Sequence, residues 1–157
     1  MSYKSQLINK INSASEIYSS ASDAGFYRYI PGGLTKPASI DQIRRIFRYC
    51  SENETSVTFR AAGTSLSGQA VTGGVLAVLT NEWNHAEYNE NKQTVICGPM
   101  ITGGDMNKLL FRRYRKIGPD PASLNACTIG GMIANNSSGM RSGIERNPYN
   151  TLKNLKF

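Results

Sequence analysis

Two stretches of the sequence consist almost entirely of small residues and could surround an anion with backbone groups. The first, RAAGTSLSGQAVTGG, spans 60–74, and the second, TIGGMIANNSSG, spans 128–139. Where side chains are this small, backbone N–H groups can approach a phosphate closely, and Ser, Thr and Asn side chains add further donors. The residue types therefore predict two loops that together bind a phosphate or diphosphate group.

The first stretch departs from the two best-known nucleotide-binding motifs. It contains G-x-x-x-x-G from Gly63 to Gly68, but Gln69 and Ala70 stand where a P-loop has Lys and then Ser or Thr. The G-x-G-x-x-G of a Rossmann turn is also missing. Taken alone, the stretch is equally compatible with a plain connection between two strands, and only its length favours a functional loop.

The elements that must position these stretches follow from the hydrophobic pattern. The pattern predicts a helix over about 40–52, with Ile40, Ile43, Ile46, Phe47 and Cys50 on one face, and a second helix over 102–115. Strands are predicted over 57–61, 75–80 and 94–99, and the segment before Pro37 is either a short strand or a polyproline segment. Strand, helix, strand order indicates a βαβ unit with a parallel component.

The remaining segments have weaker patterns. Residues 4–22 carry a thin apolar stripe typical of a surface helix, and 81–93 is predicted to be a polar turn region. From 116 to 143 no regular pattern is found, so the second stretch of small residues is expected to be a long loop. The tail TLKNLKF, 151–157, is interpreted as the first residues of a strand.

The formal net charge of +7 favours an anionic partner, and nucleic acid, anionic lipid and a phosphate-bearing cofactor all fit this charge. The densest basic run is formed by Arg112, Arg113, Arg115 and Lys116 at the end of a predicted helix. Cations there complement the helix dipole, so we interpret this run as a solvated helix end rather than a partner surface.

Three cysteines, Cys50, Cys97 and Cys127, are odd in number and far apart. This spacing argues against a disulfide framework and against a zinc or iron–sulfur site, and it favours a reducing compartment. No apolar stretch has the length of a signal-peptide core or the roughly 18 residues of a membrane span. We expect a cytoplasmic protein, and peripheral attachment at the inner face of a membrane stays open.

Several ordered motifs resemble one known family. PASIDQI, RAAGTSLSGQ, VICGPM followed by GDMNKLL, GPDPAS and TIGGMIANNSSG occur in this order. Together they closely resemble the FAD-binding domain of the vanillyl-alcohol oxidase type, known as PCMH-type. Within it the nearest likeness is to the FAD-linked D-lactate, glycolate and 2-hydroxyglutarate dehydrogenases. The resemblance covers the chain from about residue 23 to its end.

The resemblance implies an α+β fold of two α/β subdomains with FAD between them. We expect an N-terminal helix over 1–22, the first subdomain over 23–80 and part of the second over 81–157. The family's domain continues past the point where this sequence ends, so the second subdomain is expected to be incomplete. The family's catalytic residues, substrate-binding residues and metal ligands belong to that further part, and none is assigned here.

The resemblance also implies the residues that bind the cofactor. In the first stretch, backbone amides would hold the pyrophosphate of FAD, assisted by hydroxyl groups, at Ala62, Gly63, Thr64, Ser65, Leu66, Ser67, Gly68 and Gln69. In the second region the implied contacts to the remaining diphosphate and the isoalloxazine are Pro119, Ser123, Cys127, Thr128, Gly130, Gly131, Asn135, Ser138 and Gly139. Some members of the wider superfamily attach FAD through a histidine, but we interpret His85, the only histidine, as a surface residue and expect non-covalent FAD.

The function that the resemblance implies is oxidation of a 2-hydroxy acid such as D-lactate or glycolate by hydride transfer to FAD. The small substrate would bind only together with the further domain, so these 157 residues are expected to be inactive alone. The alternative is a non-catalytic module that binds a nucleotide or a partner. Binding to nucleic acid rests on charge alone, because no motif supports it, and we do not expect it.

Overall fold

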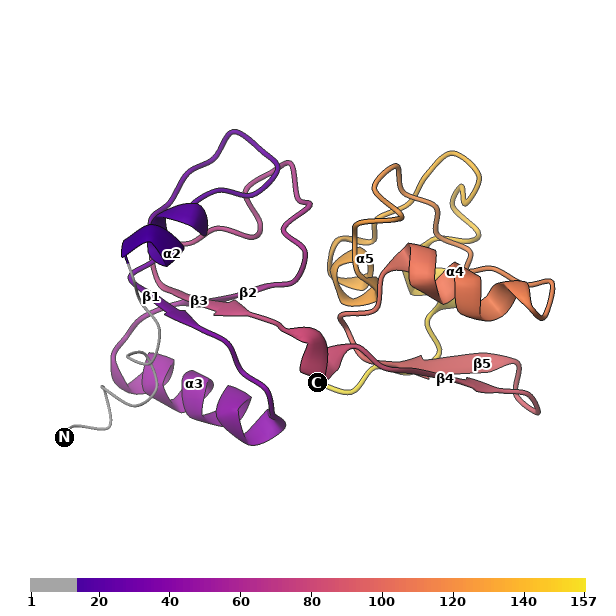
Figure 1. Cartoon of the computed structure of the whole chain (residues 1–157), viewed down its shortest axis with the longest axis horizontal. Coiled ribbons are helices and arrows are strands. Elements are labelled where there is room, and N and C mark those ends of the chain that lie inside the picture. The colour runs from indigo at the N-terminus through magenta and orange to yellow at the C-terminus, as the bar shows by residue number, and fades with distance from the viewer. Residues whose placement is uncertain (1–13) are drawn as a thin grey trace. The chain divides into compact units, whose positions relative to one another are not determined.

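The computed structural model describes residues 14–157 of the chain. It divides into two compact units, Met1–Glu82 and Trp83–Phe157, which we call unit 1 and unit 2 and describe separately (Figure 1). Residues 60–74 belong to unit 1 and residues 128–139 to unit 2. Each stretch of small residues is therefore positioned by its own set of helices and strands.

Unit 1 is built on a parallel three-stranded sheet. Its strands are β1 (Gly33–Thr35), β2 (Val57–Arg60) and β3 (Val75–Val78), in the order β1-β3-β2. The register pairs Gly33 with Val75 on one side of β3 and Val57 with Val75 on the other. The predicted βαβ unit and the strands at 57–61 and 75–80 are confirmed, and the segment before Pro37 contains a strand.

Helix α3 (Ile40–Glu52) connects β1 to β2 and confirms the predicted helix. Ser39 caps it, since its hydroxyl oxygen accepts from the backbone N–H of Gln42 at 3.3 Å. Ile46 and Cys50 are buried against Val75 and Ala77 of β3, which fixes the helix on the sheet. Ile40 and Phe47 were expected on the inward face, but they lie at its rim and are more than half exposed.

Two short helical segments complete the region before unit 2. Helix α2 (Ala14–Ser19) lies within the predicted N-terminal helix, and the rest of that prediction, up to residue 13, falls outside the described residues. The one-turn helix η1 (Asn81–Trp83) spans the division between the two units.

Unit 2 contains an antiparallel hairpin of β4 (Ala86–Asn89) and β5 (Thr94–Cys97). Strand β5 confirms the predicted strand at 94–99, but the prediction of a polar turn region for 81–93 was wrong. Ala86 and Tyr88 alternate inward from β4 and pack on the buried cluster around Met106, so two apolar residues suffice to hold this strand.

Helix α4 (Gly103–Phe111) packs Met106 and Leu110 into the core of unit 2. Its cap is Thr102, whose hydroxyl accepts from the N–H of Asp105 at 3.1 Å, as the sequence predicts. The helix ends four residues earlier than predicted, because the N–H groups of Arg113 and Arg115 both bond to the carbonyl of Leu110. The basic run therefore forms a turn after the helix.

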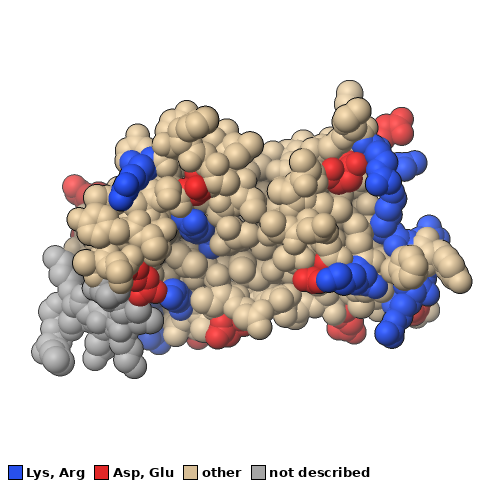
Figure 2. All heavy atoms as spheres, turned by 45° about the horizontal axis from the view of Figure 1, so that its top comes forward, with Lys and Arg blue, Asp and Glu red and all other residues tan. Residues whose placement is uncertain are grey.

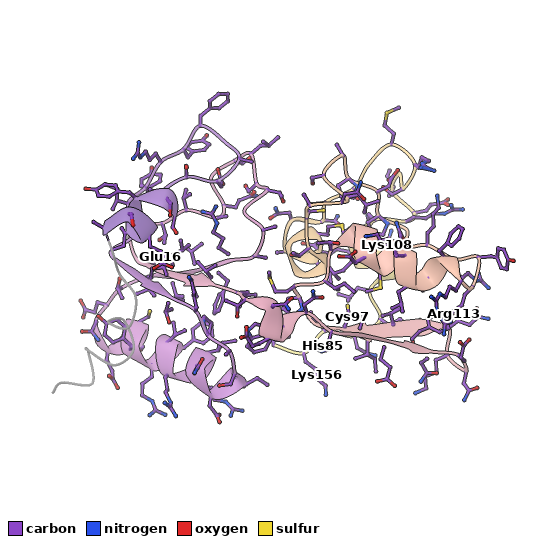
Figure 3. The ribbon with its side chains drawn as sticks, viewed as in Figure 1. Glu16, His85, Cys97, Lys108, Arg113 and Lys156 are labelled. Atoms are coloured by element: carbon purple, nitrogen blue, oxygen red, sulfur yellow. The ribbon has the colours of Figure 1, made fainter. Side chains whose placement is uncertain are left out.

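Lys and Arg side chains gather at this end of unit 2 (Figure 2). Arg113 extends over the β4–β5 hairpin, where its guanidinium lies 4.4 Å from the centre of the Tyr88 ring (Figure 3). The same side chain forms an ion pair with Glu90 at 2.7 Å. These contacts tie the turn to the hairpin.

The region after α4 contains two helices that the sequence pattern did not predict. They are α5 (Ile129–Asn135) and α6 (Pro148–Thr151), so the expected long loop over the second stretch was wrong. Met132 of α5 is buried and Ile129 packs partly buried on the core of unit 2, and these two residues in a glycine-rich helix give no periodic signal. The tail after α6 is not a strand, because residues 152–157 have no regular secondary structure.

Candidate functional site

The first stretch forms an irregular loop that leaves the carboxyl end of β2 and returns to the start of β3. We call residues 61–74 the anion loop. In parallel sheets with helical crossovers, ligands commonly bind outside the carboxyl ends of strands. All eight cofactor-contact residues predicted in unit 1, from Ala62 to Gln69, lie in this one segment.

Arg60 at the end of β2 sets the first half of the anion loop. Its guanidinium donates to the backbone carbonyls of Ser20 at 3.2 Å and Ser22 at 2.8 Å. Gly63 lies directly against it with a φ of +68°, and a side-chain carbon added at Gly63 would lie 2.6 Å from the guanidinium nitrogen. The Gly63 carbonyl in turn accepts from the N–H of Ala24 at 3.1 Å. The loop therefore lies close against the backbone of residues 20–24.

Gly68 sets the second half of the anion loop. Its φ is +73°, and an added side-chain carbon would lie 2.9 Å from the ring of Tyr27. The loop also approaches Gly25, where an added carbon would lie 2.5 Å from the carbonyl oxygen of Leu66. These contacts leave no room for larger side chains, because backbone packs on backbone and ring.

Ser65 organises part of the anion loop internally. Its hydroxyl oxygen accepts from the N–H groups of Ser67 at 3.2 Å and Gln69 at 3.3 Å, and it donates to the Gln69 side chain at 2.6 Å. These two amides are therefore already bonded within the protein. In the described part of the chain, no acceptor is found for the N–H groups of Gly63, Thr64, Leu66 and Gly68. These four donors remain available to an anion.

A buried carboxylate oxygen lies in the segment that packs on the anion loop. Asp23 accepts from the N–H of Gly25 through Oδ1 at 2.8 Å. Its other oxygen, Oδ2, is buried and has no hydrogen-bond partner among the described residues. A buried acceptor without a donor is costly, so a donor from a bound group would stabilise this position.

The second stretch begins at α5, and its first turn is bonded to the segment before α4. The N–H of Ile129 donates to the Ile101 carbonyl at 2.8 Å, and the N–H of Gly130 donates to the Pro99 carbonyl at 2.9 Å. Thr128 caps α5 by accepting from the N–H of Gly131 at 3.3 Å. The amides of Gly130 and Gly131 are therefore occupied, which the sequence did not reveal.

Gly130 has a packing role. A side-chain carbon added there would lie 2.5 Å from Pro99, so only glycine lets α5 lie this close to the segment that follows β5. Cys127, Thr128 and Pro119 are buried and contribute to the interior of unit 2. Asn135 and Ser138 are the exposed polar members of the predicted set in unit 2.

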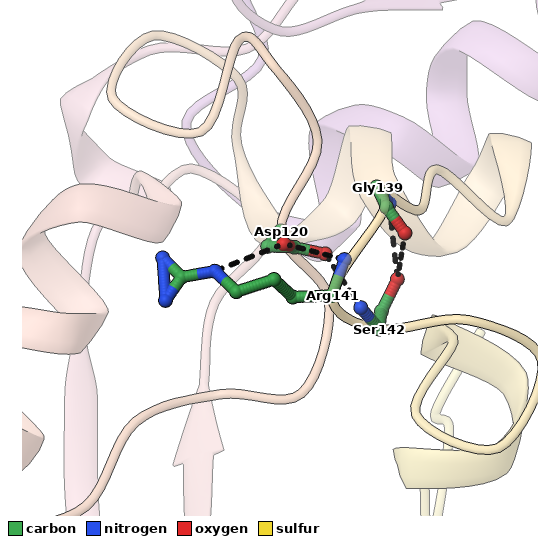
Figure 4. A network of polar contacts seen from close by, with 4 residues as sticks. All are labelled: Asp120, Gly139, Arg141 and Ser142. Atoms are coloured by element: carbon green, nitrogen blue, oxygen red, sulfur yellow. Dashed lines mark hydrogen bonds and ion pairs between the residues drawn. The ribbon is translucent and has the colours of Figure 1, made fainter.

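Asp120 closes the turn that follows the second stretch, and sequence reasoning missed it (Figure 4). Its carboxylate accepts from the N–H groups of Arg141 at 3.1 Å and Ser142 at 2.9 Å. The Arg141 guanidinium lies 3.6 Å away. Gly139 packs against the Asp120 carbonyl, and its own N–H and carbonyl both bond to the Ser142 hydroxyl. This network brings the predicted residues Pro119 and Gly139 together.

The pKa of Asp120 reflects this network. Desolvation raises the pKa of the carboxyl, but the hydrogen bonds from Ser142 and Arg141 and the charge of Arg141 outweigh it. The pKa therefore lies below its ordinary value of 3.8. The ionised form is the one that holds the turn 139–142.

His85 is exposed, in the connection between η1 and β4 (Figure 3). Its carbonyl accepts from the N–H of Gly98 at 2.9 Å, and its ring lies against that glycine. Among the described residues, no group of three His, Cys, Asp or Glu side chains is placed to hold a metal ion. Nor does any helix within residues 14–157 combine the length and apolar character that a membrane crossing requires.

Unit 1 thus holds a parallel βαβ unit with a glycine-rich loop, and unit 2 combines an antiparallel hairpin with helices. This mixed fold is that of a class of FAD-binding domains. The profile of the family described as FAD binding domain matches residues 31–157, and the chain belongs to this family. The expected α+β fold of the vanillyl-alcohol oxidase type is confirmed.

Several known proteins are similar to this chain. The glycolate oxidase subunit GlcD of Bacillus subtilis is 33% identical over 117 residues, which are 73% of this chain and 25% of that protein. The D-lactate dehydrogenase of Archaeoglobus fulgidus is 30% identical over 77% of this chain and 26% of its own length. The structure of 6-hydroxy-D-nicotine oxidase from Arthrobacter nicotinovorans superposes with a TM-score of 0.72 at 15% identity, over 91% of this chain and 31% of its own, which shows the fold. The chain therefore spans about a quarter of the length of the curated relatives.

We predict that Asp120→Asn loosens the turn 139–142. In the unaltered chain the contribution of Asp120 is fully present above the ordinary carboxyl pKa, and it is lost as the pH falls through the lowered pKa. An NMR titration of the amide protons of Arg141 and Ser142 should therefore show an apparent pKa below 3.8.

The Asp120→Asn variant should show no such titration, whereas Asp105→Asn, which alters another carboxylate of unit 2, should leave it in place. Equal titration of both amides in the Asp120→Asn variant would contradict the assignment.

Proposed function

We propose that this chain binds FAD and that the anion loop of unit 1 holds its pyrophosphate. The observation that carries the proposal is the set of unpartnered N–H groups at Gly63, Thr64, Leu66 and Gly68. Hydrogen bonds from backbone N–H groups to an oxyanion are charge-assisted and stronger than neutral ones. A bound diphosphate would thus satisfy donors that the fold leaves free.

One further feature fits this cofactor. The buried Oδ2 of Asp23 requires a donor, and the hydroxyl groups of FAD are donors that a simple phosphate dianion lacks. The anion loop and Asp23 together fit a ligand that carries both a diphosphate and hydroxyl groups.

We propose that unit 2 contributes the remaining contacts through the residues that the family resemblance implies. Asn135 and Ser138 are the exposed polar members of this set, and the Ser138 hydroxyl donates to the Asn136 carbonyl at 3.3 Å. Gly130, Gly131 and Gly139 act differently, because the first two have occupied amides and the third packs on Asp120. Gly130 and Gly139 let neighbouring backbone approach closely. The other proposed contacts of unit 2 are Pro119, Ser123, Cys127 and Thr128.

We also propose that the boundary between the two subdomains lies between residues 80 and 81.

We propose that the whole protein oxidises a 2-hydroxy acid such as D-lactate or glycolate. FAD, when bound, would accept a hydride from carbon 2 of such an acid. The support is the similarity to a glycolate oxidase subunit and a D-lactate dehydrogenase. The chain spans about a quarter of those relatives, so the groups that bind the acid and take its proton are expected outside these residues.

The alternative is a non-catalytic module that binds a nucleotide or a partner. The absorbance of bound FAD without oxygen distinguishes the enzyme from the non-catalytic module. If the whole protein is the enzyme, adding D-lactate or glycolate should bleach the FAD absorbance. Persistence of the oxidised spectrum with either acid would favour the alternative.

We propose that FAD is held without a covalent bond. The support is that His85, the only histidine of the chain, is exposed in a connection outside both stretches of small residues. Denaturing the FAD complex should release the intact cofactor. A flavin-sized increase in the mass of the denatured chain would contradict this.

We predict that Gly63→Val and Gly68→Val each weaken FAD binding by at least about a hundredfold. Both glycines have a positive φ that valine disfavours, so each substitution should displace the backbone N–H groups that bind the diphosphate. The measurement is a titration of the full chain with FAD, followed by flavin fluorescence. Gly73→Val is the matched control, because an added side-chain carbon at Gly73 meets no other atom within 4 Å.

The control should bind FAD like the unaltered chain, and circular dichroism should show that all three variants keep their strands. Retained affinity in both loop variants would show that another segment binds the diphosphate.

A further inference from the structure

The turn that follows α4 combines cations with exposed aromatic rings. We call residues 111–116, with the sequence FRRYRK, the basic turn. The ring of Phe111 is 76% exposed and that of Tyr114 is 97% exposed. Both side chains lie beside cations in the sequence and contribute nothing to the core.

The backbone of the basic turn is strained at Tyr114. Its φ is +54°, a left-handed conformation in which glycine or asparagine is usual and which is costly for a bulky residue. Its N–H bonds to the carbonyl of Phe111 at 2.9 Å, and its side chain is exposed. For stability alone glycine would serve better at this position, since the Tyr114 ring buries almost nothing.

The basic turn is fixed in place by the neighbouring hairpin. Arg113 is paired with Glu90 and stacked on Tyr88, and Arg115 donates to the side chain of Gln93 at 3.4 Å. In the described part of the chain, neither Arg112 nor Lys116 has an acidic partner. Arg113 and Arg115 thus anchor the turn. The charges of Arg112, Arg115 and Lys116 are not compensated by an acidic partner among the described residues.

Much of the charge of the chain is concentrated here. Residues 105–116 hold five cations and one carboxylate, a net charge of +4 out of the +7 of the whole chain. None of these cations is among the residues proposed to contact FAD in either unit. Figure 2 shows the same gathering of Lys and Arg on the surface.

We propose that the basic turn binds the surface of an anionic phospholipid membrane. Cations beside an anionic bilayer gain from its negative surface potential, and aromatic rings next to them are favourable at the depth of the lipid headgroups. Phe111 and Tyr114 are exposed at the end of α4, and the headgroup region of a bilayer can accommodate both rings. Single-stranded nucleic acid is instead usually bound in a groove that follows the backbone. The proposal is independent of FAD binding.

The test is flotation of the full chain with vesicles of phosphatidylcholine alone and of phosphatidylcholine with about one third phosphatidylglycerol. We expect binding to the anionic vesicles only. Replacing Arg112, Arg115 and Lys116 by Gln should weaken this binding about a hundredfold, because each cation near the surface contributes roughly fivefold in affinity. Replacing Phe111 and Tyr114 by Ser should weaken binding even at high salt, where electrostatic attraction is screened.

The matched control replaces Arg44, Arg45 and Arg48 of α3 by Gln, which removes the same charge from exposed positions of unit 1. It should lose only a few-fold in affinity. An equal loss in the control would show that net charge alone attracts the chain, and this would overturn the proposal. So would a chain that does not bind anionic vesicles but binds a single-stranded oligonucleotide through the same three cations. Circular dichroism of every variant should match that of the unaltered chain.

Discussion

The close contact between the anion loop and residues 20–27 is the constraint on which the candidate site depends. Arg60 holds the carbonyls of Ser20 and Ser22, and Gly63 fits against its guanidinium only because it has no side chain. Gly68 repeats this arrangement against the ring of Tyr27. Within this packing Ser65 bonds the amides of Ser67 and Gln69. Among the described residues no acceptor is found for the amides of Gly63, Thr64, Leu66 and Gly68.

Unit 2 follows a different design. Its small residues are used to pack α5 against the segment after β5, and Asp120 then ties the turn 139–142 to the chain before α5. The two stretches of small residues looked alike in the sequence. Among the described residues, the first stretch has four backbone N–H groups without an acceptor, whereas the N–H groups of Gly130 and Gly131 in the second stretch are bonded. Binding of an anion by backbone donors is therefore a property that the structure supports for unit 1, and unit 2 is better suited to side-chain contacts from Asn135 and Ser138.

The parts of the fold with strong local signals were predictable. The cap at Ser39 and the apolar stripe marked α3, and β-branched runs marked β2, β3 and β5. Strand β4 was missed because its pairing with β5 depends on two inward residues in a polar segment. Helix α5 was missed because glycines at its start obscure the periodicity, and the cap at Thr128 was not recognised. The anion loop was predictable from residue size, whereas Arg60, Asp23 and Asp120 act through contacts distant in sequence.

The central claim is that the amides of the anion loop bind the diphosphate of FAD, and a ¹⁵N–¹H NMR titration of the full chain with FAD tests it most directly. The account predicts large shifts for the N–H groups of Gly63, Thr64, Leu66 and Gly68, and smaller ones for those of Ser67 and Gln69, which Ser65 already occupies. Saturation with FAD that leaves the first four amides unmoved, while signals elsewhere shift, would contradict the account.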